Sequence, residues 1–482
     1  MDAGPGPERR GPPLTIAIIG AGPAGTVAAL NLLLLARRAD HPVRVLLLDR
    51  KTFTEYGPAG CNLCAGVMSA ALIHDLENLG VIIPPHVIQQ KILGYEMVTR
   101  GGSVFLPRPL GSVIYTAYRG IGPRGLAYDE ERSFDAFLLR SAIQAGAAYR
   151  NSLVVEIQRR SGAPGFQLQC QDSETFDADV IIGAFGINST LGRRLMSLGI
   201  GYRPPRAVLA CQAEIPVDEA FINEHYQGQI KIINLGLHRI RFASLTPKQR
   251  HVTVSIIGPV VTRLDLMTFL EHPAVLRHFP PGWHCPDWFC ACQPTLPVTA
   301  AAHPIADGLV VVGDADISRY LKDGIGSAFF TAARAAQAVL AGAGNRKTLS
   351  RLYYRPSRRR FRVDNWVGRV LFAGNDLISR CPVMVAAFLA VARWEQKHLP
   401  PGRRPLNEFL WGMFTGDAPY LTALRTALRP GLLARLVWQT LAATLAWLRG
   451  DLKPAAEDVE PARRQKEAIR CPPATQNPKS KI

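Results

Sequence analysis

Short apolar runs and an Ala/Leu-rich stretch follow one another near the start of the chain. Residues 14–20 (LTIAIIG) and 43–48 (VRVLLL) are rich in β-branched and aliphatic side chains, which is typical of buried parallel strands. Between them, residues 26–38 are rich in Ala and Leu and predict a helix. The order strand, helix, strand predicts a βαβ unit within a parallel sheet.

The pattern changes in the middle of the chain. Apolar runs at 208–213, 230–235 and 252–257 predict antiparallel strands with one buried face. A later apolar strand runs into residue 313, and an Ala-rich helix is predicted from residue 324 to about 341. An antiparallel sheet is therefore expected between two parts of a parallel α/β unit.

The last third of the chain is predicted to be helical and basic. Residues 346–362 are rich in Arg and interleaved with Tyr and Phe, and Pro356 is expected to break this stretch in two. We interpret it as a solvated basic face near anionic lipid or a substrate phosphate, with a plain surface linker as the alternative. An RNA-binding patch is disfavoured because no RNA-binding motif accompanies it, and no nucleic-acid partner is expected.

Residues 431–448 carry apolar side chains at a helical period, with Arg435 as their single charge. This stretch is short for a membrane span. An interfacial helix, with Trp438 and Trp447 at the depth of the lipid headgroups, and a buried helix that closes a channel remain equally open.

Composition narrows the class of protein. The chain has 482 residues, 56 Lys and Arg against 38 Asp and Glu, a net charge of +18 and 48% hydrophobic residues, so it forms cores and is neither fibrous nor disordered. The positive charge suits phosphates or an anionic membrane. Nine cysteines, an odd number in so long a chain, do not indicate a secreted disulfide framework. We expect a cytoplasmic protein with peripheral contact to the inner face of the membrane.

The first strand leads directly into a G-x-G-x-x-G turn, and the second ends in an acidic residue. The first glycine permits a tight turn, the second lets a pyrophosphate approach the backbone, and the third lets helix pack on strand. The acid would hold the adenosine ribose. The predicted dinucleotide site consists of Gly20, Ala21, Gly22, Pro23, Ala24, Gly25, Asp49 and Arg50.

A second motif combines Gly313-Asp314 with Gly324-Ile325-Gly326 at the start of the Ala-rich helix. Here the chain resembles FAD-dependent enzymes of the p-hydroxybenzoate-hydroxylase fold, and within them the geranylgeranyl-reductase-like group. The resemblance implies that FAD is the cofactor and that Asp314 holds its ribityl chain. It places the 324–326 loop beside the flavin pyrimidine, where a helix N-terminus stabilises negative charge.

Three further stretches bear on this resemblance. Arg132, one residue off the register of the group's R-x-x-F-D helix, is the candidate for an FAD phosphate contact. Phe185 replaces the aspartate of the fold's middle D-G motif, which makes direct reduction by NADPH doubtful. Cys64-Ala65-Gly66 resembles the group's C-G-G-type loop near the flavin, and Cys64 is the candidate proton donor, with an ordered water as the alternative. No metal site is expected.

The predicted substrate pocket combines this loop with the antiparallel sheet. Its members are Cys61, Gly66, Phe242 and Pro247. Phe242 as plain core is the alternative, and the strand lacks the tryptophan that the reductases often carry there. The ligand is expected to be a small lipid-like molecule.

The resemblance implies an α/β fold with a Rossmann-like FAD-binding domain, an α+β substrate domain and a helical C-terminal region. The expected boundaries are a disordered 1–13, an FAD domain of 14–90, 130–200 and 300–345, a substrate domain of 91–129 and 201–299, a helical region of 346–450 and a disordered tail of 451–482.

The resemblance predicts a reductase that passes a hydride from flavin N5 to C=C bonds of a prenyl or other lipid chain. Its electron donor, NAD(P)H, ferredoxin or quinol, is left open, and an electron-donor protein is a candidate partner. The alternatives are a monooxygenase or halogenase of the same fold and, more distantly, a non-catalytic FAD-stabilised scaffold or nucleic-acid binder.

Overall fold

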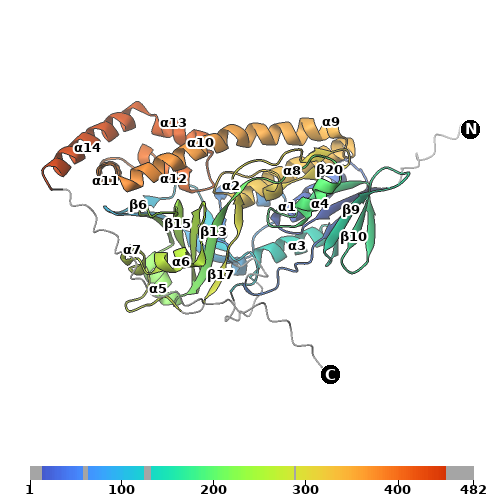
Figure 1. Cartoon of the computed structure of the whole chain (residues 1–482), viewed down its shortest axis with the longest axis horizontal. Helices are drawn as coiled ribbons and strands as arrows, with labels where there is room; N and C mark the ends of the chain where they lie inside the picture. Colours follow the sequence, from blue (N-terminus) through green and yellow to red (C-terminus); the bar gives the residue numbers. More distant parts are fainter. Residues whose placement is uncertain (1–12, 58–62, 124–131, 287–288, 452–482) are drawn as a thin grey trace, which may run out of the picture.

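A six-stranded, mainly parallel sheet forms one end of the molecule (Figure 1). The computed structural model describes residues 13–57, 63–123, 132–286 and 289–451. In spatial order the strands are β19 (Ile305–Ala306), β20 (Leu309–Val311), β12 (Val180–Gly183), β1 (Leu14–Ile19), β2 (Val43–Leu48) and β8 (Ala148–Arg150). β19 is antiparallel to β20 and the remaining pairs are parallel. The predicted βαβ unit is present, with α1 (Pro23–Arg38) between β1 and β2.

Helices cover this sheet because their small and aliphatic residues bury against it. α1 packs against α3 (Phe134–Gln144) and against α8 (Gly324–Gly342), the Ala-rich helix expected from the sequence. Ala residues let these helices approach closely. α4 (Leu191–Ser197) and a three-stranded antiparallel sheet, β9 (Val154–Arg159), β10 (Phe166–Cys170) and β11 (Thr175–Ala178), lie beside the same unit.

An eight-stranded sheet forms the second body of the fold. Its central strands alternate in direction, as the sequence predicts, and β14 pairs in parallel with β5. Its members are β17 (Cys290–Cys292), β13 (Ala207–Pro216), β16 (His251–Gly258), β15 (Phe242–Pro247), β14 (Gln229–Asn234), β5 (Gly94–Thr99) and β6 (Gly102–Pro107), with β18 (Thr295–Pro297) paired to β13.

Smaller elements complete the fold. A three-stranded sheet combines β3 (Val67–Met68), β7 (Ile114–Ala117) and β4 (Ile88–Ile92). The short helices are α2 (Ala70–Asn78), α5 (Glu219–Phe221), α6 (Arg263–Leu270) and α7 (Pro273–Leu276). The α/β class with an antiparallel sheet and a helical C-terminal region is confirmed, whereas the domain boundaries stay a prediction.

The C-terminal helices form a layer along one edge of the molecule (Figure 1). They are α9 (Arg346–Leu349), α10 (Arg355–Arg380), α11 (Pro382–His398), α12 (Pro405–Phe414), α13 (Tyr420–Ala427) and α14 (Pro430–Leu448). Among the described residues, α14 is the single helix long and apolar enough alone to cross a membrane. The segment α9–α10 and the helix α11 are together long and apolar enough as well, and the chain bends by 106° between them.

The expectation that Pro356 breaks the basic stretch is wrong. A π-helical turn over Ser350–Tyr354 joins α9 to α10, and Pro356 stands in the first turn of α10. A proline inside a helical segment removes one backbone hydrogen bond, and the wider π turn before it relieves the clash of its ring with the preceding turn. The basic residues therefore lie on one nearly continuous helical segment.

Candidate functional site

The glycine turn after β1 admits only glycine at two of its positions. Gly20 has φ +105°, and a Cβ there would lie 2.5 Å from the carbonyl oxygen of Ala184. A Cβ on Gly25 would lie 1.8 Å from the carbonyl oxygen of Gly20. Backbone therefore packs on backbone where α1 leaves the turn, as a pyrophosphate-binding turn requires.

Asp49, at the end of β2, faces this turn. Its Oδ2 accepts a hydrogen bond from the Ala21 N–H at 2.8 Å, and its Oδ1 accepts one from the Lys51 N–H at 2.9 Å. Arg50 is exposed. The carboxylate thus fixes the turn, and its predicted contact with a ribose stays a prediction.

Arg119 is the guanidinium that faces the glycine turn. A Cβ on Gly22 would lie 3.6 Å from Arg119 Nη2, and Arg119 donates to both oxygens of Asp135 at 3.1 and 2.5 Å. Tyr118 pairs with Ser133 as a parallel bridge, and the Asp135 N–H donates to the Arg119 carbonyl at 3.0 Å, so Arg119 lies beside the start of α3.

The contact of Arg132 with a cofactor phosphate stays a prediction, whereas Arg119 is the guanidinium that lies beside the glycine turn. The Arg132 guanidinium donates to the side chain of Gln249, in the turn between β15 and β16. The sequence signal was the R-x-x-F-D pattern, which identifies the correct helix. The pattern does not indicate Arg119, which precedes it in the chain and lies beside Gly22 in space.

The two glycine-containing motifs meet in space. A Cβ on Gly313 would lie 3.1 Å from Ala24 Cβ, so the start of α1 contacts the G-D-A segment. Asp314 lies beside the start of α8, because a Cβ on Gly324 would lie 3.8 Å from its Oδ1. These contacts bring together the turn, Asp314 and the 324–326 loop that the sequence predicted to share one site.

Asp314 carries an unsatisfied polar atom. Its Oδ1 is buried and has no hydrogen-bond partner within the part of the chain that the structure describes. Burial raises the pKa of this carboxyl, while Ser318 and the charge of Arg119 act in the opposite direction. A buried carboxylate oxygen without a donor is costly, and a bound hydroxyl group would satisfy it.

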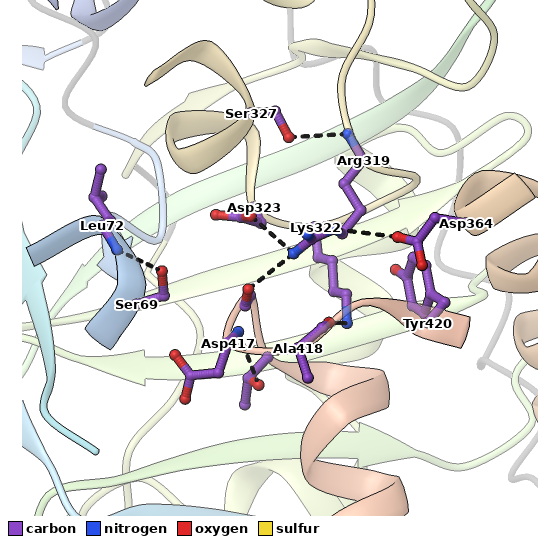
Figure 2. A network of polar contacts seen from close by, with 12 residues as sticks. Ser69, Leu72, Arg319, Lys322, Asp323, Ser327, Asp364, Asp417, Ala418 and Tyr420 are labelled. Atoms are coloured by element: carbon purple, nitrogen blue, oxygen red, sulfur yellow. Dashed lines mark hydrogen bonds and ion pairs between the residues drawn. The ribbon is translucent and has the colours of Figure 1, made fainter. Parts of the chain in front are cut away.

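A network of buried charges fixes the loop before α8, as Figure 2 shows. Arg319 donates to Asp323 at 2.9 Å and to the Gly416 carbonyl at 2.8 Å, and its Nε lies 3.4 Å from Asp364 Oδ2. Lys322 donates to the carbonyl of Gly412 and lies 3.9 Å from the centre of the Tyr420 ring. The start of α8 is therefore clamped by the C-terminal helices.

The same loop stores backbone strain. Leu321 and Asp323 have φ values of +58° and +53°, which lie in a backbone region that residues other than glycine rarely adopt. Burial raises the pKa of Asp323 to about 6 and lowers the pKa of Lys322 well below its usual value. A Cβ on Gly326 would lie 2.3 Å from Asp323 Oδ1, so Gly326 leaves room for this carboxylate over the first turn of α8.

Asp417 connects the α12–α13 loop with α2 and with the segment before β7 by hydrogen bonds. Its Oδ1 accepts from the Ala70 N–H at 3.1 Å, and its Oδ2 accepts from Ser112 Oγ and from Trp411 Nε1, both at 3.0 Å. The C-terminal region thus contributes to the site, which its basic and apolar composition alone did not indicate.

The Cys64 loop is held against the antiparallel sheet by a buried ion pair. Lys248 Nζ donates to the Cys64 carbonyl at 2.9 Å and to Glu214 Oε1 at 2.6 Å, and both charged side chains are fully buried. A Cβ on Gly66 would lie 1.9 Å from the Ala117 carbonyl oxygen. The Cys64 side chain is partly buried.

Of the predicted pocket residues, Gly66 and Pro247 lie near each other and Phe242 lies elsewhere. The Pro247 carbonyl accepts from Thr116, the neighbour of Ala117 on β7. Phe242, at the other end of β15, contacts the rings of Phe372 and Phe414. Cys61 lies outside the described residues.

An apolar cavity of about 240 Å³ lies between the eight-stranded sheet and the C-terminal helices. Its wall is formed mainly by aliphatic and aromatic side chains of β5, α10, α11 and α12, among them Met97, Leu371, Leu389, Phe409 and Met413. Leu371 and Met413 are the chain neighbours of Phe372 and Phe414. The Phe372 ring contacts the Tyr420 ring, and the ammonium group of Lys322 lies over the Tyr420 ring. Aromatic rings therefore connect the cavity wall with the loop before α8.

The described residues contain no group of three or more His, Cys, Asp or Glu side chains that could hold a metal ion. Cys290 and Cys292 lie on β17.

No protein-family model matches the chain. It is 22% identical over 275 residues to the chloroplastic geranylgeranyl diphosphate reductase of Nicotiana tabacum, covering 55% of this chain and 52% of that protein. It is 32% identical over 181 residues to an Escherichia coli protein named as an electron transfer flavoprotein-quinone oxidoreductase, covering 37% and 38%. The chain thus spans about half or less of the length of these curated relatives.

Solved structures show the same fold at low identity. A geranylgeranyl bacteriochlorophyll reductase-like protein from Thermoplasma acidophilum superposes with a TM-score of 0.59 at 17% identity, covering 88% of this chain and 99% of that one. The halogenase PltM, in a mutant form in complex with FAD, gives 0.57 at 15% identity, covering 92% and 93%. The resemblance drawn from the sequence is confirmed at the level of the fold.

Proposed function

We propose that this chain is an FAD-dependent oxidoreductase that reduces C=C bonds in a prenyl or other lipid chain. The observation that carries the proposal is the apolar cavity joined through aromatic rings to the loop at the start of α8. Support for the fold comes from the structural neighbours, which include a geranylgeranyl-reductase-like protein and an FAD complex.

The residues present fit FAD. Gly20 and Gly25 form a turn that leaves the backbone open to a pyrophosphate, and Arg119 adds a positive charge beside Gly22. The unsatisfied Oδ1 of Asp314 would accept a hydrogen bond from a ribityl hydroxyl. The start of α8, clamped by Arg319 and its partners, would stabilise negative charge on the pyrimidine ring.

When bound and reduced, FAD supplies a hydride from N5. Reduction of a C=C bond then needs that hydride on one carbon and a proton on the other. The chain contributes an apolar cavity that binds the substrate and excludes water. Cys64, held through its carbonyl by Lys248, is our candidate proton donor, and an ordered water is the alternative.

The role of the cavity in substrate binding is tested by filling the cavity with a larger side chain. Gly374 lines the cavity, and a Cβ added there meets no atom within 4 Å, so Gly374→Leu would project a side chain into the space without a backbone clash. We expect at least a tenfold loss of kcat/KM for a long prenyl substrate while FAD stays bound. Gly431→Leu on α14, also in open space, is the matched control and should keep the parent rate. Equal activity in the two variants would place the substrate elsewhere.

The role of Cys64 is tested by Cys64→Ser. We expect reoxidation of the flavin by substrate to slow while FAD is retained, because a hydroxyl is a weaker acid than a thiol. An unchanged rate would remove Cys64 from the chemistry and leave the water as the donor.

A monooxygenase or halogenase is the second candidate, because a halogenase superposes almost as well as the reductase-like protein. Oxygen consumption in step with product formation would favour it. Peroxide as the sole product of oxygen would argue against it.

A further inference from the structure

The outward side of α10 carries an exposed apolar stripe. Val363, Trp366, Val370 and Leu377 are between 48% and 69% exposed, and their spacing of three, four and seven residues places them on one side of the helix. The opposite side carries the buried residues, such as Phe361 and Phe372. The fold therefore does not require this exposed apolar stripe.

α14 carries a second apolar face. Only 11% of the apolar stretch that makes up α14 is buried, although the helix packs against α11. Its exposed large apolar residues are Leu433, Val437, Trp438, Leu441, Leu445, Trp447 and Leu448. Figure 1 shows α10 and α14 in the same outer layer of helices, away from the sheets.

Exposed arginines lie next to the apolar stripe of α10, on the same helix and on the turn before it. Arg351, Arg355, Arg359 and Arg362 are exposed on this helical segment, directly before the apolar stripe. The chain as a whole carries a net charge of +18. Exposed Trp and aliphatic residues next to Arg are the composition of helices that lie at the surface of an anionic bilayer.

Val370 connects this surface with the cavity. It belongs to the exposed stripe and also lines the cavity, together with Leu371, Gly374 and Ile378 of the same helix. A bilayer that covers the stripe would therefore lie directly against the cavity wall.

We propose that the outward faces of α10 and α14 dock on an anionic lipid bilayer, and that the lipid chain enters the cavity beside Val370 without passing through water. The docking rests on the exposed residues alone. The entry route rests on the proposed function.

The experiment measures flotation of the full chain with vesicles of phosphatidylcholine and phosphatidylglycerol, compared with phosphatidylcholine alone. The parent should bind the anionic vesicles and should dissociate as salt is raised. Two variants remove the apolar faces, Trp366→Gln with Leu377→Gln on α10, and Trp438→Gln with Leu441→Gln and Leu445→Gln on α14. Each should lose at least tenfold in vesicle affinity.

The matched control places Gln at Ile82, Leu110 and Leu264, which are at least as exposed and lie outside α10 and α14. It should bind vesicles as the parent does, and all variants should keep the thermal unfolding midpoint of the parent. Absence of parental binding, or an equal loss in the control, would overturn the docking proposal. So would a parental dimer that dissociates in the α14 variant while vesicles remain unbound, because the face would then join two copies of the chain.

Failure of the proposed function is distinguishable from failure of docking. Vesicle binding without any reoxidation of the flavin by lipid would preserve the docking and remove the reductase. For the entry route, the α10 variant should keep its rate on a detergent-dispersed substrate and lose at least tenfold on the same substrate in vesicles. An equal rate on both would contradict entry from the bilayer.

Discussion

Arg119 and Asp135 form a two-point ion pair that places a guanidinium beside the glycine turn. Arg119 Nε and Nη2 lie 3.1 and 2.5 Å from the two oxygens of Asp135, a fully buried carboxylate at the start of α3. The pair holds the start of α3 against the residues that follow β7. It leaves the same guanidinium 3.6 Å from the position of a Cβ on Gly22.

Replacement of Arg119 tests this relationship. Arg119→Met leaves Asp135 buried without its counter-charge, and we expect a loss of about 3 kcal/mol in the free energy of unfolding. Affinity for FAD should fall at least tenfold, with partial recovery in Arg119→Lys. Urea unfolding and flavin fluorescence titration measure the two effects. Arg132→Met is the comparison, and a larger loss of FAD affinity there than in Arg119→Met would return the phosphate contact to Arg132.

The glycine turn should not tolerate a methyl group where α1 begins. Gly25→Ala places Cβ 1.8 Å from the Gly20 carbonyl oxygen, and we expect a loss of at least about 2 kcal/mol in stability. Gly431→Ala has open space and should change stability by less than about 1 kcal/mol, in the stabilising direction. Thermal and urea unfolding of the two variants check this contrast, which would disappear if the turn relaxed freely.

Asp314→Asn should affect the free protein and the FAD complex in opposite directions. The amide oxygen of Asn is neutral and costs less to bury without a donor than the carboxylate oxygen does, so the protein without FAD should become more stable by about 1 kcal/mol. Affinity for FAD should fall at least tenfold, because an amide forms weaker hydrogen bonds with hydroxyls than a carboxylate does. Unfolding midpoints with and without FAD measure both effects. A parallel loss in both states would mean that Asp314 is structural only.

Sequence patterns predicted the elements that local physics determines. The β-branched runs before Gly20 and Asp49 form central strands, and the Ala-rich stretch after Gly324 forms α8, because burial of small and aliphatic residues decides these elements. The antiparallel strands follow in the same way. Their ends differ from the prediction by at most three residues.

Contacts between distant segments were not predictable in this way. Arg119 reaches the site because its neighbour Tyr118 pairs with Ser133, and Lys248 reaches Cys64, which is 184 residues away in the chain. The clamp of the C-terminal helices on Arg319 likewise depends on tertiary packing. No periodicity or motif in the chain encodes these pairs.

The buried His251 should make the free energy of unfolding depend on pH. Burial, with the charges of Lys248 and Arg250, lowers its pKa to about 3, while its Nδ1 lies 3.0 Å from the Tyr118 hydroxyl. Below pH 6.5 the unfolded chain binds a proton here that the folded chain does not, so this group destabilises the fold as pH falls from 6.5 towards 3. The slope approaches about 1.4 kcal/mol per pH unit.

His251→Gln isolates this contribution, because Gln does not titrate. At pH 7 the variant should be less stable than the parent, since it loses the contact with Tyr118. The difference should shrink between pH 6.5 and 5, since only the parent carries the proton-linked penalty. Urea unfolding at several pH values measures it, and a difference that stays constant with pH would contradict a neutral buried His251.

An anaerobic flavin spectrum shows directly whether the protein reduces lipid double bonds. The FAD-loaded protein is reduced with dithionite without excess, and a prenyl lipid is then added. We predict that the absorbance of oxidised flavin returns without oxygen, and that the lipid gains mass in steps of two hydrogens. A flavin that stays reduced until air enters would contradict the reduction of lipid double bonds and favour oxygen chemistry.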